Sequence, residues 1–271
     1  MWTKTLLERS AGDWKLTRRM YVQIDELELL GDRCAKCDLC TDSCPKEALS
    51  FEVGAAGERK QLLVDPEKCV FCGTCVAACV YHALAQRTND EEVIPVVEKK
   101  VFPLMVQEGQ VQVLQEEAAK KCPTCHICVA QCPKEAISLK FVDGIPQIMV
   151  DYAKCAGCRS CAVNCPVNII TTQPAFEGTL EINMEQAQEP DIAKQLVEIC
   201  PMECFGLSDD GELTHDQAAC TFCGACLYAP GAPENMIIIK RTAMREVPGF
   251  SSGVIEEIHK KLLTPGATSA E

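Results

Sequence analysis

The sequence has few aromatic residues, no long apolar run and no excess of positive charge. No hydrophobic stretch approaches the roughly 20 residues that a membrane-spanning helix needs, and the first residues lack the apolar core of a secretory signal. A net charge of −13 argues against nucleic acid as a partner. No glycine-rich phosphate loop follows a strand-like segment, so neither a nucleotide or flavin site nor a small-molecule substrate is expected. We therefore expect a cytoplasmic chain without a membrane span.

Cysteine is the residue in excess, with 21 copies among 271 residues. The spacing Cys-x2-Cys-x2-Cys-x3-Cys occurs four times. The four runs are Cys34, Cys37, Cys40 and Cys44; Cys69, Cys72, Cys75 and Cys79; Cys122, Cys125, Cys128 and Cys132; and Cys155, Cys158, Cys161 and Cys165. A repeated spacing of thiols predicts metal ligands.

Two other uses of cysteine fit this pattern less well. A disulfide scaffold is disfavoured by the odd number of cysteines and by the missing export signal. A zinc ribbon separates its two Cys-x2-Cys pairs by about 15–20 residues. Here each run instead places a third and a fourth cysteine directly behind the first pair.

The four runs are arranged in two matching units. In residues 21–90, two apolar segments flank a glycine-rich turn between Cys44 and Cys69. In residues 116–175 the same order returns between Cys132 and Cys155, with Asp143 and the following glycine as the turn. Apolar segments on either side of such a turn predict a β-hairpin. The shared stretches CPKEALS and CPKEAIS indicate an internal duplication.

Each unit resembles, from end to end, the two-cluster bacterial ferredoxins. In that family three thiolates of one run bind a [4Fe–4S] cluster and the fourth binds the neighbouring cluster. The resemblance implies four ligand sets, which we call sites 1 to 4. Site 1 is Cys34, Cys37, Cys40 and Cys79; site 2 is Cys69, Cys72, Cys75 and Cys44; site 3 is Cys122, Cys125, Cys128 and Cys165; site 4 is Cys155, Cys158, Cys161 and Cys132.

Residues 176–240 form a third unit with half of the ligands. When Cys200 is aligned with Cys44, the three preceding ligand positions fall on Pro190, Ala193 and Leu196. One cluster site is therefore missing. The remaining set, which we call site 5, is Cys220, Cys223, Cys226 and Cys200. This unit is similar to the single-cluster, ferredoxin-like domain found with electron-transfer-flavoprotein oxidoreductases.

Twenty cysteines are thus expected to bind iron in five [4Fe–4S] clusters, and Cys204 remains. It stands where the other units have Ala48 and Ala136, so we predict a small buried residue and not a ligand. His126 lies between two ligands of site 3. It is expected either to be an exposed loop residue or to donate a hydrogen bond to cluster sulfur.

The fold class expected is α+β, with tandem ferredoxin-like domains, two complete and one half-degenerate. Residues 1–20, with both tryptophans, are expected to form a short helix on the body or an arm that grips a partner. Residues 91–115 are predicted to be an extended connector, as a pair of strands or a docking arm. Residues 241–271 are predicted to hold a helix with Val254, Ile255, Ile258 and Leu262 on one face. That helix either covers the body or enters a partner's groove.

As a whole the chain looks like a polyferredoxin, most like the subunits attached to formylmethanofuran dehydrogenase, hydrogenase or heterodisulfide reductase. The F subunit of formylmethanofuran dehydrogenase is the specific expectation. The resemblance implies single-electron relay within a larger anaerobic oxidoreductase, with other subunits or soluble ferredoxin as partners and no catalysis by this chain alone. The acidic charge favours partners with basic docking faces. Two alternatives stay open, a ferredoxin-type enzyme with its own substrate or flavin-linked activity and a structural scaffold.

Overall fold

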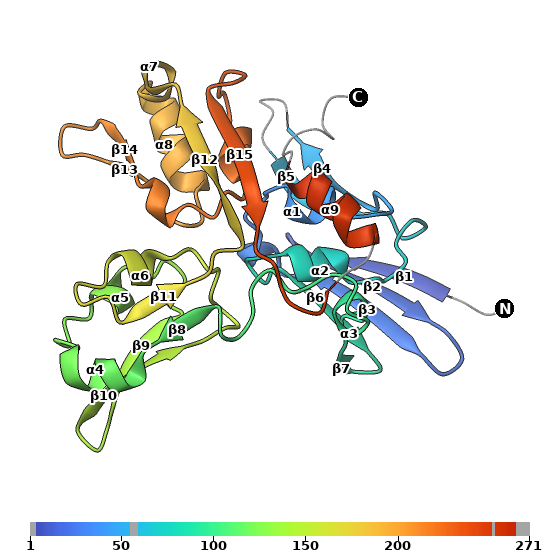
Figure 1. Ribbon diagram of the computed structural model, residues 1–271. Coiled ribbons are helices and arrows are strands. Elements are labelled where there is room, and N and C mark those ends of the chain that lie inside the picture. The colour runs from blue at the N-terminus through green and yellow to red at the C-terminus, as the bar shows by residue number, and fades with distance from the viewer. Residues whose placement is uncertain (1–3, 55–58, 251–252, 264–271) are drawn as a thin grey trace.

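The computed structural model describes residues 4–54, 59–250 and 253–263. Three units of strands and short helices meet near the middle of the molecule (Figure 1). The largest core cluster joins the first and third units, and separate clusters lie within the first and the second unit. Each unit combines a β-hairpin with a second antiparallel strand pair. The hairpins are β4–β5, β9–β10 and β13–β14, and the pairs are β3–β6, β8–β11 and β12–β15. The mixed α+β architecture in tandem units is therefore confirmed.

The first unit is built on a five-stranded antiparallel sheet in the order β1-β2-β3-β6-β7. Its elements are β1 (Lys4–Arg9), β2 (Trp14–Arg19), β3 (Ile24–Leu29), the 3₁₀ helix η1 (Gly31–Arg33), α1 (Leu39–Asp42), β4 (Leu49–Val53), β5 (Arg59–Val64), α2 (Thr74–Ala78), β6 (Leu84–Thr88) and β7 (Glu91–Glu92). The hairpin expected after Cys44 is present, although residues 55–58 of its turn lie outside the described residues.

The expectation for residues 1–20 is wrong, because β1 and β2 extend the sheet of the first unit. Trp14 and Leu16 point into the core from β2, and Leu27 and Leu29 do so from β3. This alternation is typical of strands with one buried face. The Trp14 Nε1–H donates to the Leu62 carbonyl at 2.8 Å, which fixes the sheet against β5.

The connector predicted for residues 91–115 is only partly extended. It begins with β7, which pairs with β6, and it also contains α3 (Pro95–Glu98) and β8 (Val111–Val113). Pro95 occupies the first helical turn, where its missing N–H costs no hydrogen bond. Phe102 and Met105 are fully buried, and the Met105 N–H donates to the Ala77 carbonyl of α2 at 2.9 Å. The segment is thus packed on the first unit, and neither a strand pair nor a free arm forms there.

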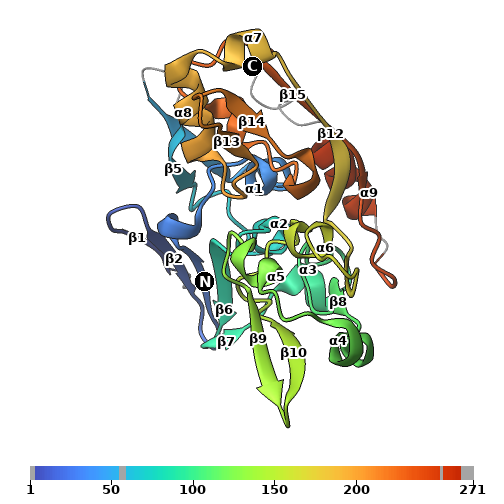
Figure 2. The same cartoon turned by 90° about the vertical axis from the view of Figure 1, so that its left-hand side faces the viewer.

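The second unit follows the same plan as the first. Its elements are β8, α4 (Gln115–Lys121), α5 (Ile127–Ala130), β9 (Ile137–Val142), β10 (Ile145–Val150), α6 (Ser160–Val163) and β11 (Ile170–Thr172). The predicted turn at Asp143 and Gly144 joins β9 to β10, and both residues have positive φ, as such turns require. The β9–β10 hairpin projects from the body (Figure 2).

The third unit replaces a cysteine run by a helix. Its elements are β12 (Phe176–Ile182), α7 (Met184–Ala187), α8 (Pro190–Ile199), β13 (Phe205–Leu207), β14 (Leu213–His215), the 3₁₀ helices η2 (Gln217–Ala219) and η3 (Ala225–Tyr228), and β15 (Ile237–Met244). Pro190, Ala193 and Leu196, which stand at the lost ligand positions, belong to α8. Ala193 and Leu196 fill core space from that helix.

The C-terminal helix is α9 (Gly253–Leu263), and it covers the body. Ile255, Ile258 and Leu262 are buried, whereas Val254 is exposed, so its predicted place on the apolar face is wrong. Ser251 and Ser252 before the helix, and Pro265 and Gly266 after it, lie outside the described residues. Within the described residues, no helix has both the length and the apolar composition that a bilayer crossing requires.

Candidate iron–sulfur sites

The backbone of the cysteine loops repeats in all five candidate sites. The residue before the second cysteine of each set has a left-handed conformation; these residues are Lys36, Phe71, Thr124, Gly157 and Phe222. The fourth cysteine of each set comes from a different part of the unit. The third residue after that fourth cysteine is also left-handed; these residues are Glu47, His82, Glu135, Asn168 and Glu203. Non-glycine residues rarely adopt this conformation, and they concentrate at binding sites. Site 5 shares both features, with Glu203 following Cys200.

The fold brings together the four thiols of every predicted set. In each set burial raises the pKa of a thiol, and repulsion from the thiolate contributed by the other run raises it further. The pairs that show this are Cys40 with Cys79, Cys75 with Cys44, Cys128 with Cys165, Cys161 with Cys132, and Cys226 with Cys200. Crossing of ligands between the halves of a unit is therefore compatible with the geometry.

The surroundings of the thiols fit an iron–sulfur cluster. One cavity is lined by all four cysteines of site 1 and another by all four of site 5. Backbone N–H groups donate to sulfur at 3.3 Å in four sites. These bonds run from Ala48 to Cys44, from Ala83 to Cys79, from Ala136 to Cys132 and from Cys204 to Cys200. Such bonds stabilise the negative charge of ligating thiolates and tune the bound metal.

Side-chain hydroxyls two residues after the second cysteine add to this pattern in sites 2 and 4. The Thr74 hydroxyl lies 3.3 Å from the sulfur of Cys72 in site 2, and the Ser160 hydroxyl lies 3.6 Å from that of Cys158 in site 4. A ligating thiolate can only accept, so the hydroxyl is the donor when iron is bound. The equivalent positions of sites 1, 3 and 5 are Leu39, Ile127 and Ala225, which have no hydroxyl.

The thiols differ in exposure. Burial raises the pKa of Cys155 to about 11 and that of Cys161 to about 12, so both are neutral thiols near pH 7 without iron. Cys125 of site 3 is exposed, as is the neighbouring His126. Site 3 is therefore at the surface of the second unit. Within the described residues, no three cysteine, histidine or acidic side chains converge closely enough to hold a single metal ion.

Cys204 is buried beside two thiols of site 5. The hydrogen bond from the Cys204 side chain lowers the pKa of Cys200 to about 6, although burial opposes this shift. The pKa of Cys204 itself is raised, first by its hydrogen bond to Cys200 and then by its hydrogen bond to Cys220. The backbone bond to Cys200 matches those to Cys44 and Cys132. The arrangement places Cys204 as an S–H donor next to the site.

Sites 1 and 5 are joined by a buried polar contact between the first and third units. Arg241 of β15 pairs with Asp38, which follows Cys37, at 2.7 Å between Nη2 and Oδ1. Both side chains are inaccessible to solvent, at 0% and 1% exposure. Arg241 Nη2 also donates to the carbonyl of Cys223 at 3.0 Å. Gly224 has φ of +91°, and a Cβ there would lie 2.8 Å from the Asp38 carboxylate, so only glycine fits.

Tyr81 lies between the same two sites. Its hydroxyl is 2.9 Å from the Thr221 hydroxyl, and it also hydrogen-bonds the thiol of Cys223. Burial, and then repulsion from Cys223 and Cys37, raises the pKa of Tyr81, so its hydroxyl is neutral and can donate. Repulsion also links the thiols of Cys37 and Cys223 to each other. Sites 1 and 5 are therefore in close contact.

The second unit meets the others at the same place. His82 Nε2 lies 3.0 Å from the carbonyl of Cys155 in site 4. Because a carbonyl only accepts, Nε2 carries the proton. The Lys134 ammonium lies 5.5 Å from the centroid of the Tyr81 ring. Sequence reasoning missed these contacts between units and the Arg241–Asp38 pair.

Comparison with known proteins agrees with this geometry. The family described as "4Fe-4S dicluster domain" matches residues 33–83 and 121–186, and a second family with the same description matches residues 68–136. The chain therefore carries 4Fe-4S dicluster domains. Among curated proteins, the formate dehydrogenase iron-sulfur subunit of Wolinella succinogenes is 36% identical over 69 residues, which are 24% of this chain and 34% of that protein.

Another relative is the electron transport protein HydN of Escherichia coli, which is 30% identical over 112 residues, or 38% of this chain and 54% of HydN. The chain thus matches between about a third and a half of the length of these two proteins. One solved structure to which this chain is similar is a chain in the formate dehydrogenase–heterodisulfide reductase–formylmethanofuran dehydrogenase complex of Methanospirillum hungatei. It has 26% identity and a TM-score of 0.80, over 98% of this chain and 93% of that chain.

Proposed function

We propose that the chain, which carries 4Fe-4S dicluster domains, relays single electrons through five [4Fe–4S] clusters. Each cluster, when bound, exchanges one electron at a time. The observation that carries this proposal is the repeated backbone of five cysteine loops, each with four thiols drawn from two segments of one unit.

We assign the ligands as sites 1 to 5 and leave Cys204 outside them. Two observations support the assignment of Cys200 as the fourth ligand of site 5. Its sulfur accepts the N–H of the residue four positions later, as Cys44, Cys79 and Cys132 do. The left-handed Glu203 also stands where the other units have a left-handed residue.

The order of the sites in space differs from their order in the sequence. Cys75 of site 2 lies close enough to Cys40 of site 1 for the repulsion between their thiolates to raise the pKa of Cys40. Cys128 of site 3 raises the pKa of Cys161 of site 4 in the same way. Site 5 contacts site 1 across Tyr81 and Arg241. The positive charge of Arg159, between two ligands of site 4, acts on Cys220 of site 5. We propose the order 2, 1, 5, 4, 3, in which the third unit bridges the two complete ones.

The chain's own residues give this path its rigidity. The buried Arg241–Asp38 pair joins the loops of sites 1 and 5, and Arg241 also donates to the carbonyls of Phe222 and Leu262. A buried guanidinium held by four hydrogen bonds fixes one arrangement. A fixed separation between neighbouring sites is what efficient transfer of electrons requires.

The setting we propose is a larger oxidoreductase complex. The relatives include an iron-sulfur subunit of formate dehydrogenase, and the solved chain of similar structure belongs to a complex with formylmethanofuran dehydrogenase and heterodisulfide reductase. We propose that other subunits of such a complex, or a soluble ferredoxin, exchange electrons with this chain in the cytoplasm. The exposed site 3 is one terminus of the path.

Metal analysis of protein purified without oxygen tests the proposal. Five clusters of four irons predict about 20 iron and about 20 acid-labile sulfide per chain. Cys226→Ser is expected to lower both by about four. About 16 of each in the unchanged chain would mean that site 5 holds no cluster. Zinc without sulfide would contradict the whole proposal.

A further inference from the structure

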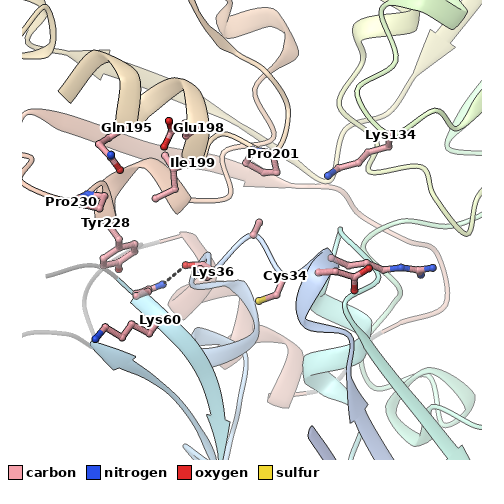
Figure 3. Close-up of a pocket in the computed structure, with 14 residues that line it drawn as sticks. Cys34, Lys36, Lys60, Lys134, Gln195, Glu198, Ile199, Pro201, Tyr228 and Pro230 are labelled. Carbon is pink, nitrogen blue, oxygen red and sulfur yellow. Dashed lines mark hydrogen bonds between the residues drawn. The ribbon is translucent and has the colours of Figure 1, made fainter. Parts of the chain in front are cut away.

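A cavity of about 410 Å³ opens where the three units meet (Figure 3). Its walls come from η1 and β5 of the first unit, from the loop after Cys132 in the second, and from α8 and η3 in the third. In Figure 3 Lys134 reaches toward the gap from the second unit, opposite Cys34 and Lys36 of the first. The cavity therefore exists only when the units are packed together.

The cavity is basic in an otherwise acidic protein. Five cationic side chains line it, against the carboxylates of Asp32 and Glu198. The cations are Arg33, Lys36, Arg59, Lys60 and Lys134. In the part of the chain that the structure describes, none of them forms an ion pair. The whole chain carries −13, so this concentration of positive charge is local.

Two of the cations are held in place without a carboxylate. The Arg59 guanidinium lies 3.2 Å from the centroid of the Tyr228 ring and 4.5 Å from that of Phe51, and it donates to the Lys36 carbonyl at 3.1 Å. Lys134 is half-buried above the Tyr81 ring. Cations fixed by aromatic faces keep their charge available, and little side-chain entropy is lost when an anion binds.

The cavity lies beside three of the candidate sites. Cys34 of site 1 is among its lining residues, Pro201 directly follows Cys200 of site 5, and Lys134 is two residues after Cys132 of site 4. A partner bound here would be close to the middle of the proposed path. Arg33, Lys36 and Lys60 are exposed, so an approaching partner meets these cations before the thiolates behind them.

We propose that this cavity is the docking site of an acidic electron-transfer protein, whose carboxylate side chains enter among the five cations. This inference rests on the relay proposed above. Complementary charge selects and orients such a partner, and the acidic remainder of the chain repels it from other faces. The net charge of the whole chain favours partners with basic docking faces, but the cavity is basic and therefore selects an acidic partner.

Stopped-flow reduction tests the proposal with the full chain. A two-cluster bacterial ferredoxin with an acidic surface, reduced beforehand with dithionite, is mixed with the oxidised chain at increasing NaCl. We expect the second-order rate to fall with salt, because opposite charges attract. Lys60→Glu is expected to slow the low-salt rate roughly tenfold and to flatten its salt dependence, and Lys60→Gln to have an intermediate effect.

Lys140→Glu is the matched control, since Lys140 is exposed at the corresponding hairpin of the second unit and does not line the cavity. The control is expected to react like the unchanged chain. Equal slowing by both glutamate substitutions, or a rate that rises with salt, would overturn the proposal. Inorganic pyrophosphate that binds the chain tightly in equilibrium dialysis, without slowing ferredoxin, would also overturn it in favour of a small-anion site.

Iron content and reduction by dithionite are measured for every variant. A chain without reducible clusters would refute the relay itself. If dithionite reduces the chain but the rate of reduction by ferredoxin is the same in the Lys60 variants and the unchanged chain, only the docking site is refuted.

Discussion

Replacing Arg241 by methionine should cost about 3–5 kcal/mol of unfolding free energy, because it leaves a buried carboxylate without its partner. The guanidinium makes four hydrogen bonds, to Asp38 at 2.7 Å, to the carbonyls of Phe222 and Leu262 at 2.7 and 2.6 Å, and to that of Cys223 at 3.0 Å. The other carboxylate oxygen of Asp38 is buried and has no protein hydrogen-bond partner, so Arg241 supplies the carboxylate's only neutralising contact within the described residues.

The neighbouring residue is the matched control. Lys240 pairs with Glu181 at 2.9 Å, but the two side chains are 60% and 55% exposed. Exposed pairs contribute about 0–1 kcal/mol, so Lys240→Met should have a small effect. The double variant Asp38→Asn/Arg241→Met removes the unpaired charge and should recover much of the loss.

Anaerobic unfolding in guanidinium chloride, followed by circular dichroism and by the visible absorbance of the clusters, measures these differences. If Arg241→Met costs no more than Lys240→Met, or if the double variant is no more stable than Arg241→Met, the buried pair does not hold the first and third units together. The reasoning about site 5 as a bridge would then fail with it.

Three further outcomes are expected. Cys200→Ala should remove about four irons per chain and Cys204→Ala none, and equal losses would contradict the ligand assignment. Thr74→Val removes the hydroxyl beside Cys72. It should lower the reduction potential of site 2 by tens of millivolts in an EPR-monitored titration. Thr41→Val is the control, because the Thr41 hydroxyl donates to the Asp38 carbonyl, and it should leave the potential of site 2 unchanged. Tyr81→Phe should retain all iron but lower the potential of site 5, and an unchanged potential would refute the hydrogen bond to Cys223.

The candidate sites were largely predictable because ligand spacing is a local property of the sequence. Three thiols of each set stand within seven residues, and the resemblance to two-cluster ferredoxins implies which cysteine of the other run is the fourth. The hairpins were equally visible, because turn residues such as Asp143 act over a few positions. In each case the information lies in neighbouring residues.

The contacts between units could not be predicted, because they depend on packing of distant segments. Asp38 and Arg241 are 203 residues apart in the sequence, and Tyr81 and Thr221 are 140 apart. No spacing or periodicity marks them. The first twenty residues could not be assigned to strands for another reason. Trp14 and Leu16 alternate with charged residues over one short segment, and so few positions give only a weak strand signal.

An anaerobic reductive titration followed by EPR tests the central claim most directly. The account predicts that the full chain takes up about five electrons reversibly, with signals broadened by magnetic interaction between neighbouring reduced clusters. Arg241→Met should weaken the interaction between sites 1 and 5. A chain that takes up no electrons at accessible potentials, or whose clusters all give isolated and unbroadened signals, would contradict the relay.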